Sequence, residues 1–356
     1  MRVFQWRRGA DAAIRLFVLS LGGLSACDFP TDVPRWDTRW VIPAENTSFP
    51  VAQLLPGGIA LTNDGEAFAV PLSAISISRT LREICAACSA VDGLTVPKPP
   101  FTVSFGGDLE LPEGLLAARL LEGGVEFRLR HDFPFDPLRP SATARGYLLL
   151  SVRSGSTLLA RDSIDGRSTA LPPGRGIVRT LQLQTGDIAG PLEVGITLHS
   201  PLGDPVTIDL DDRLVLDVPP GEIAIADARV LVSDRSISTP EIVLDMSNIE
   251  TTVSERVQGG AVQLQITNPF DISGEFELRI VTPTGQVVRP VEIAQGESNV
   301  RIELNGDEMR SMLGQSDVRL SLAGVASSAA GGTEVHPSDE IALAARLEMV
   351  VATRRD

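Results

Sequence analysis

Apolar and polar residues alternate with a period of two in many segments of this 356-residue chain. Such alternation places every second side chain on one face of an extended strand, so it predicts half-buried β-strands. Glycine (32 residues) and proline (25 residues) separate the alternating runs as turn residues do. Many short strands with few helices favour β-sandwiches. The clearest runs are 101–105, 125–129, 262–266, 276–280 and 300–304.

Helix signals occur at only two places. Thr80 and Glu83 have the spacing of a capping box ahead of residues 84–89. Residues 305–313 begin with Asn305 and read as a short capped helix. The sequence therefore predicts an all-β protein with few short helices.

One phrase occurs twice. GGVEFRLRHDFPFD covers residues 123–136, and GGAVQLQITNPFD covers residues 259–271. Weaker similarities lie in the same order on either side, between 108–111 and 247–250 and between 211–216 and 338–343. These similarities predict two related tandem β-sandwich units.

The repeated phrase has a structural interpretation. Proline cannot donate to a β-ladder, so the strand pairing ends there. The following phenylalanine then closes the end of the sandwich, and the glycine pair permits a tight entry into the strand.

The segment Thr267-Asn268-Pro269-Phe270, set in an alternating strand, resembles the Asn-Pro segment of LEA type 2 (water stress and hypersensitive response) domains. The first copy departs from this pattern, since His131-Asp132-Phe133-Pro134 lacks the Asn-Pro pair. The resemblance implies an immunoglobulin-like β-sandwich of about 100 residues and a stabilising or interaction role.

The N-terminus has the features of an export signal. A basic start and a short apolar run over residues 16–24 are typical of a secretory signal. The exit Leu24-Ser25-Ala26-Cys27 resembles the lipobox of bacterial lipoproteins. That resemblance implies cleavage before Cys27 and acylation of Cys27, which would anchor the protein to a membrane. Asp28, the residue after Cys27, does not decide whether the anchor would lie in the inner or the outer membrane.

The predicted domains follow from these features. Residues 1–26 are the signal peptide, and residues 27–107 form an extended leader and a β-rich N-terminal region in which Trp36 and Trp40 hold the leader on the first domain. The first sandwich repeat covers 108–218, a connecting segment covers 219–245, and the second repeat covers 246–356.

Composition excludes some partners. The net charge of −15 repels the phosphates of nucleic acids. Aromatic residues make up only 4 % of the chain, which disfavours surfaces that stack bases or sugars.

Cys85 and Cys88 are the remaining thiols if Cys27 is acylated, and an exported protein meets an oxidising compartment. Their spacing favours a structural disulfide. A thiol–disulfide oxidoreductase remains an alternative, although it would need a βαβ context.

Other chemistry is weakly indicated. The histidines His131, His199 and His336 lack ligand spacing for zinc. Asp209, Asp211 and Asp212 are weak calcium candidates because no glycine-centred loop surrounds them. No nucleophile elbow or phosphate loop occurs, so the sequence predicts no enzyme and no cofactor.

The leading functional hypothesis is an exported, lipid-anchored envelope protein that binds or supports an envelope protein or polymer. The alternatives are a carrier of an apolar ligand such as lipid, and the oxidoreductase built on Cys85 and Cys88.

Overall fold

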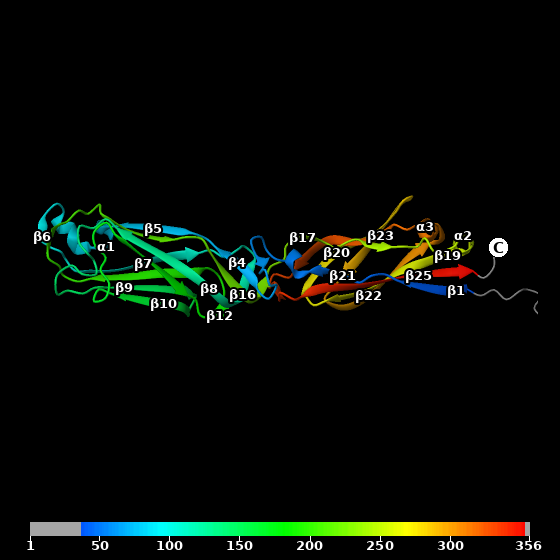
Figure 1. Cartoon of the computed structure of the whole chain (residues 1–356), viewed down its shortest axis with the longest axis horizontal. Coiled ribbons are helices and arrows are strands. Elements are labelled where there is room, and N and C mark those ends of the chain that lie inside the picture. The colour runs from blue at the N-terminus through cyan, green and yellow to red at the C-terminus, as the bar shows by residue number, and fades with distance from the viewer. Residues whose placement is uncertain (1–36, 353–356) are drawn as a thin grey trace, which may run out of the picture.

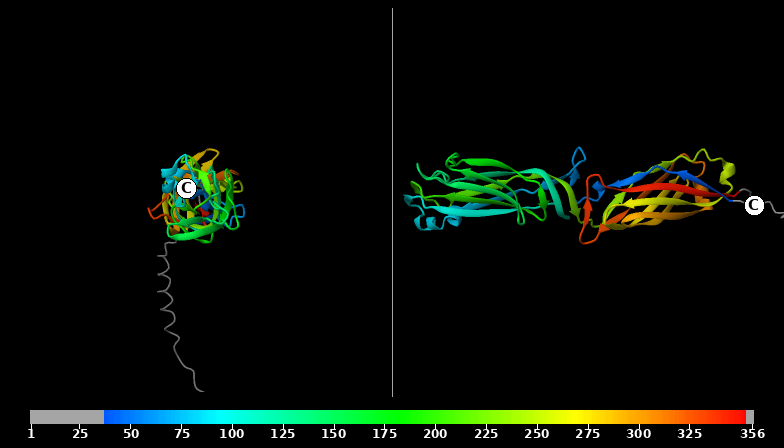
Figure 2. Two further views of the ribbon diagram at one scale, coloured as in Figure 1. Left: turned by 90° about the vertical axis from the view of Figure 1, so that its left-hand side faces the viewer. Right: turned by 90° about the horizontal axis from the view of Figure 1, so that it is seen from below.

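The structure is a computed structural model that describes residues 37–352. Two β-sandwiches lie end to end and give an elongated molecule (Figure 1). Figure 2 shows the same linear arrangement from below. The predicted signal peptide, Cys27, Asp28 and Trp36 lie outside the described residues.

The first sandwich consists of two antiparallel layers of four strands, one of which is part of a larger nine-stranded sheet. One sheet has the order β5–β15–β8–β11, and the other has the order β7–β13–β9–β10. The strands are β5 (Ile75–Thr80), β7 (Phe101–Leu109), β8 (Leu115–His131), β9 (Tyr147–Ser154), β10 (Thr157–Asp165), β11 (Gly176–Gln182), β13 (Leu192–Ser200) and β15 (Arg213–Val218).

The second sandwich repeats this order. One sheet runs β1/β2–β25–β19–β22, and the other runs β17/β18–β23–β20–β21. The strands are β1 (Asp37–Pro43), β2 (Thr47–Pro50), β17 (Arg235–Ser238), β18 (Ile242–Leu244), β19 (Val257–Asn268), β20 (Ile272–Thr282), β21 (Gly285–Ile293), β22 (Gly296–Asn305), β23 (Val318–Ser328) and β25 (Glu340–Ala352).

Numbered along each sandwich, the strands have the order 1-8-3-6 facing 2-7-4-5. This eight-stranded, two-sheet arrangement is a jelly roll. The prediction of an all-β protein with related sandwich units and few short helices is confirmed. The connectivity differs from the seven-stranded order of immunoglobulin constant-type domains, because strands 1 and 8 lie side by side here.

The first jelly roll is inserted into the second. Strand 1 of the second jelly roll ends at Pro50, and its strand 2 begins only at Arg235. The insertion is possible because the two ends of the first jelly roll are adjacent, with Ile75 paired to Val218. Residues 27–107 were predicted to form one N-terminal region, but the described part of this range is divided between the two jelly rolls.

The placement of β1 shows this division. Trp40 pairs with Met349 of β25, in the second jelly roll and not on the first domain as the sequence predicted. Strands 1 and 8 are neighbours in a jelly roll. In the second jelly roll these are β1, at the start of the described chain, and β25, at its end.

A joint sheet connects the two bodies. The first half of β8 pairs with β16 (Gly221–Val230) and β12 (Gly186–Ile188), whereas its second half pairs with β15 and β11. β24, from the second jelly roll, pairs with β16 at Ala228↔Val335. Gln53 also holds Ser238 by two hydrogen bonds of 3.0 and 2.9 Å. The remaining joint strands are β3 (Ala60–Leu61), β4 (Phe68–Leu72) and β24 (Thr333–Val335).

The repeated glycine pairs lie within strands β8 and β19 rather than at a tight entry. A β-carbon at Gly123 would lie 2.5 Å from Cγ2 of Ile223, and one at Gly260 would collide with the carbonyl oxygen of Glu348. Glycine is therefore required at positions 123 and 260 because a neighbouring strand approaches closely.

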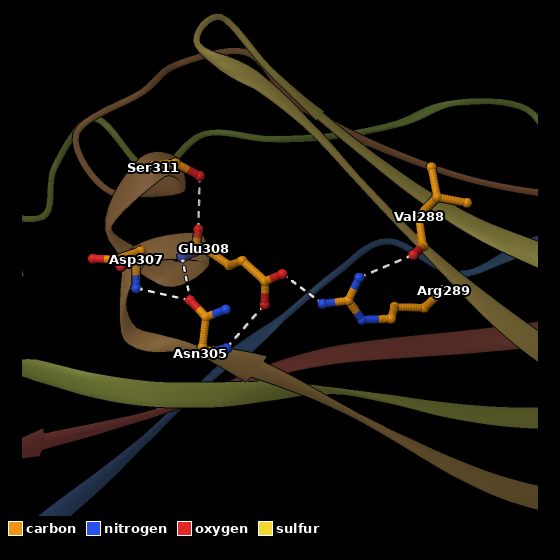
Figure 3. A network of polar contacts seen from close by, with 6 residues as sticks. All are labelled: Val288, Arg289, Asn305, Asp307, Glu308 and Ser311. Carbon is orange, nitrogen blue, oxygen red and sulfur yellow. Dashed lines mark hydrogen bonds and ion pairs between the residues drawn. The ribbon is translucent and has the colours of Figure 1, made fainter.

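Short helices close both ends of the molecule. At the end where β1 and β25 meet, α3 (Gly306–Met312) is capped as predicted. The Asn305 side chain accepts hydrogen bonds from the backbone of Asp307 and Glu308, and the Glu308 carboxylate accepts from Asn305 and Arg289 (Figure 3). The other short elements are α1 (Leu81–Ile84), α2 (Thr251–Ser254), η1 (Val51–Gln53), η2 (Ala86–Val91), β6 (Thr95–Pro97) and β14 (Pro205–Thr207).

Candidate functional site at the far tip

The first copy of the repeated phrase lies at the end of β8, at the tip farthest from β1 and β25 (Figure 1). The Asp136 carboxylate accepts hydrogen bonds from the backbone nitrogens of Leu138 (2.8 Å), Arg139 (3.0 Å) and Leu171 (2.8 Å). Nε2 of the buried His131 lies 3.1 Å from the carbonyl oxygen of Leu171. The phrase therefore fastens the 166–175 loop to the corner, which agrees with its structural interpretation.

The second copy performs the same task with an amide. Asn268 is fully buried, and its Nδ2 donates to the carbonyl oxygens of Ile272 (3.3 Å) and Ala294 (3.2 Å). Its Oδ1 accepts from the backbone nitrogen of Phe270 at 3.0 Å. This corner lies at the joint, where the backbone nitrogen of Asp271 donates to Thr333. The corner of the second copy therefore lies at the joint with the first jelly roll, whereas the corner of the first copy lies at the far tip.

The phenylalanines of the first phrase form a buried stack. The ring centroids of Phe133 and Phe135 are 5.2 Å apart, and His131 lies 5.1 Å from Phe133 on the other side. Phe133 is completely buried and Phe135 is 7 % exposed, so the prediction that phenylalanine closes the end of the sandwich agrees with the structure.

Lys98 lies beside this stack, against the rings of Phe101 and Phe135. It is the only lysine of the chain, and it is completely buried. Its Nζ donates to Oγ of Ser200 (2.6 Å) and to the carbonyl oxygen of Pro201 (2.5 Å). Nζ also lies 4.7 Å from the ring centroid of Phe101 and 5.4 Å from that of Phe135. Lys98 forms no ion pair with any residue between 37 and 352.

Burial shifts the protonation of both bases. Burial lowers the pKa of Lys98 from 10.5 to about 7. Burial also lowers the pKa of His131, although the Leu171 carbonyl and the carboxylates of Asp136 and Asp132 partly oppose the shift. Nδ1 of His131 has no hydrogen-bond partner among the described residues. The tip therefore holds two bases whose charged forms are disfavoured.

The predicted calcium candidates lie beside this corner. Burial, together with the negative charges of Asp209, Asp132 and Asp211, raises the pKa of Asp212 to about 6. The Asp209 carboxylate accepts from the backbone of Asp211, whose own carboxylate lies 3.7 Å from Arg82. Within the described chain, no group of three or more His, Cys, Asp or Glu side chains is arranged to hold a metal ion. The geometry gives the calcium hypothesis no support.

Cys85 and Cys88 form a disulfide, with their sulfurs 1.97 Å apart and both residues completely buried. The predicted capping box precedes them, since the Thr80 backbone nitrogen donates to Glu83 at 2.7 Å. A thiol oxidoreductase requires an accessible sulfur, and these sulfurs are covered. The geometry suits a structural bond.

Replacing both Cys85 and Cys88 with serine is expected to destabilise the first jelly roll by about 1–2 kcal/mol, because the closed loop is very short. Urea unfolding of the wild type and of the double variant measures the effect. Native wild-type protein should give no titratable thiol at these positions. Rapid reduction by a small dithiol without unfolding would instead support the redox alternative.

The three histidines occupy separate places. His131 lies in the buried corner, and His336 contacts Asp339 at 3.0 Å. His199 lies on the outer face of β13, where it stacks on Tyr147 with centroids 5.0 Å apart and bonds Thr102 at 2.8 Å. They form no common site.

Sequence reasoning missed the buried contacts of Lys98 with Ser200 and Phe135. Ser200 follows Lys98 by 102 residues, so spacing could not connect them. The available signal was the lone lysine in an arginine-rich chain: arginine stays charged, whereas lysine can lose its proton in an apolar site.

Comparison with known proteins identifies no family. No protein family matches the chain, and no curated protein is similar to it. Among solved structures, a putative secreted protein from Parabacteroides distasonis is 11 % identical over 87 % of this chain and 99 % of that chain, with a TM-score of 0.33.

Two other structures give lower scores. The tandem CBM22 domains of Xyn10C from Paenibacillus barcinonensis are 9 % identical over 80 % of this chain and 98 % of that chain, with a TM-score of 0.17. A Broad Bean Stain Virus structure is 12 % identical over 94 % of this chain and 95 % of that chain, with a TM-score of 0.19. All three TM-scores are below 0.5, so we base no functional argument on them.

Proposed function

We propose that this protein is a lipid-anchored, non-enzymatic module of a bacterial cell envelope that holds its far tip away from the membrane for contact with an envelope protein or polymer. The observation that carries the proposal is the pairing of Asp37 with Ala352 at one end of the elongated molecule. The described chain therefore begins and ends at the same end, and the tip lies at the other (Figure 1).

The anchor and this end are close in sequence. Nine residues lie between Cys27 and Asp37, and the ten residue steps between them can span at most about 35 Å. An acyl anchor at Cys27 would keep the second jelly roll near the membrane and place the inserted first jelly roll outside it. Within residues 37–352, no helix is long and apolar enough to cross a membrane.

The alternatives receive less support. A lipid carrier needs a large apolar cavity. The apolar hollow inside the second jelly roll measures about 20 Å³, whereas a hollow of about 1220 Å³ on the outer face of β20 and β21 is open and lined partly by Glu275, Glu277 and Glu292. The oxidoreductase would need exposed sulfur, and both cysteines are buried.

The anchor is tested by replacing Cys27 with serine in the bacterial host. Wild-type protein should sediment with membranes and have the mass of an acylated chain beginning at Cys27. The Cys27→Ser variant should lose membrane association, whereas the Cys85→Ser/Cys88→Ser variant should keep it. Wild-type protein that begins before Cys27, or that carries an unmodified thiol there, would contradict the proposal.

A further inference from the structure

The tip encloses an ionisable arrangement that the second corner lacks. Along the stack, His131, Phe133 and Phe135 follow at centroid distances of 5.1 and 5.2 Å, and Nζ of Lys98 lies 5.4 Å from Phe135. Two buried bases therefore contact one aromatic cluster, His131 at Phe133 and Lys98 at Phe135 and Phe101. At the corresponding corner of the second jelly roll, the buried Asn268 cannot change its charge between pH 5 and 9.

Each base fastens a different part of the tip. His131 holds the 166–175 loop through the Leu171 carbonyl, and Lys98 ties the segment before β7 to Ser200 and Pro201 after β13. The 132–146 connection follows His131 in the chain, and its Phe133 and Phe135 contact His131 and Lys98 respectively. A change in the charge of Lys98 or His131 therefore affects the loops that cover this end of the sandwich.

We propose that the tip is an acid-loosened latch, in which protonation of the buried bases Lys98 and His131 releases the 132–146 and 166–175 loops. The inference does not depend on the lipid anchor. It adds a control of tip structure to a chain whose proposed function is contact through that tip.

The chemistry of the two sites sets the direction. A protonated Lys98 carries a charge that no carboxylate balances, although both of its oxygen partners remain and the rings of Phe101 and Phe135 offset part of the cost. A protonated His131 places a second charge against Phe133 and adds a proton at Nδ1, which has no acceptor among the described residues. Both charged forms are better solvated when the loops open, so acid favours opening.

Neighbouring charges modify the response. Asp136 and Asp132 favour protonated His131 in the closed tip. They therefore reduce the pKa difference of His131 between the closed and the open tip. Asp212 acts in the opposite sense, because its pKa is raised to about 6 and its protonation stabilises the closed tip. Arg139 lies on the 132–146 loop and donates hydrogen bonds to the carbonyl oxygens of Gly166 and Arg167. Between pH 7.5 and 5.5, proton uptake at His131 and the last part of the Lys98 titration favour the open tip, and together they exceed the opposing effect of Asp212, so the tip loosens as pH falls.

Hydrogen exchange of the full-length mature protein, read by mass spectrometry, tests the latch at pH 7.5 and 5.5. After correction for intrinsic rates, peptides covering 132–146 and 166–175 should exchange about tenfold faster at pH 5.5. His131 accounts for most of this change, because the open tip takes up a proton there below pH 6.5 that the closed tip does not, whereas Lys98 contributes only down to its closed-state pKa of about 7. Peptides covering 266–273, at the Asn268 corner, should change less than twofold. This comparison within one molecule needs no variant.

The matched variant is Lys98→Met/His131→Asn. Methionine keeps the length of the lysine stem, and asparagine supplies the amide that the second corner already uses. The acid response at the tip should fall below twofold. Equal acceleration in wild type and variant, equal acceleration at both corners, or no acceleration in the wild type would each overturn the proposal.

Discussion

Replacing Phe49 with alanine is expected to lower the unfolding free energy of the second jelly roll by about 3–5 kcal/mol. Phe49 in β2 is completely buried, pairs with Ile341 of β25, and lies 5.8 Å from Phe276 across the core. The alanine would leave a cavity between the two sheets. Urea unfolding, with hydrogen exchange reporting each jelly roll separately, measures which body is weakened.

Trp40→Ala is the matched control in the adjoining strand β1. Trp40 is 41 % exposed, so its loss should cost less than about 1 kcal/mol. Weakening of the first jelly roll by Phe49→Ala, with the second unchanged, would contradict the insertion of one jelly roll into the other. That outcome would restore the separate N-terminal region that sequence order suggests.

The sequence predicted the strands well because the alternation of polar and apolar residues is a local consequence of one buried face. Runs such as 125–129, 262–266 and 276–280 lie within β8, β19 and β20. The insertion could not be predicted in this way, since alternation in β1 and β2 does not say which strand is their partner. β25 lies about 300 residues later in the chain, and only the jelly-roll order brings strands 1 and 8 together.

The prediction of the site succeeded where chemistry depends on short spacing. Cys85 and Cys88 are three residues apart, and the structure pairs them. It failed where partners come from distant segments, as for Lys98 with Ser200 and Pro201. Composition alone does not distinguish an exposed lysine from a buried one, so the lone Lys98 gave no prediction of its burial.

In the two copies of the repeated phrase, equivalent residues make different hydrogen bonds. Asp136 and Asp271 occupy matching places, but Asp136 accepts three backbone hydrogen bonds. Among the described residues, the Asp271 carboxylate accepts none, and the corner is held instead by the Asn268 amide and by Thr333. The second copy thus uses the residue before the proline for the work that the first copy divides between His131 and Asp136.

This difference predicts unequal effects of equal changes. Asp136→Ala should destabilise the first jelly roll by about 2–4 kcal/mol, because the backbone nitrogens of Leu138, Arg139 and Leu171 lose a charged acceptor. Asp136→Asn should cost about half as much, since Oδ1 can still accept while the amide nitrogen cannot accept from Leu171. Asp271→Ala should stay within about 0.5 kcal/mol of wild type. Urea unfolding of the three variants measures these values, and equal losses for Asp136→Ala and Asp271→Ala would show that the two corners are held in the same way.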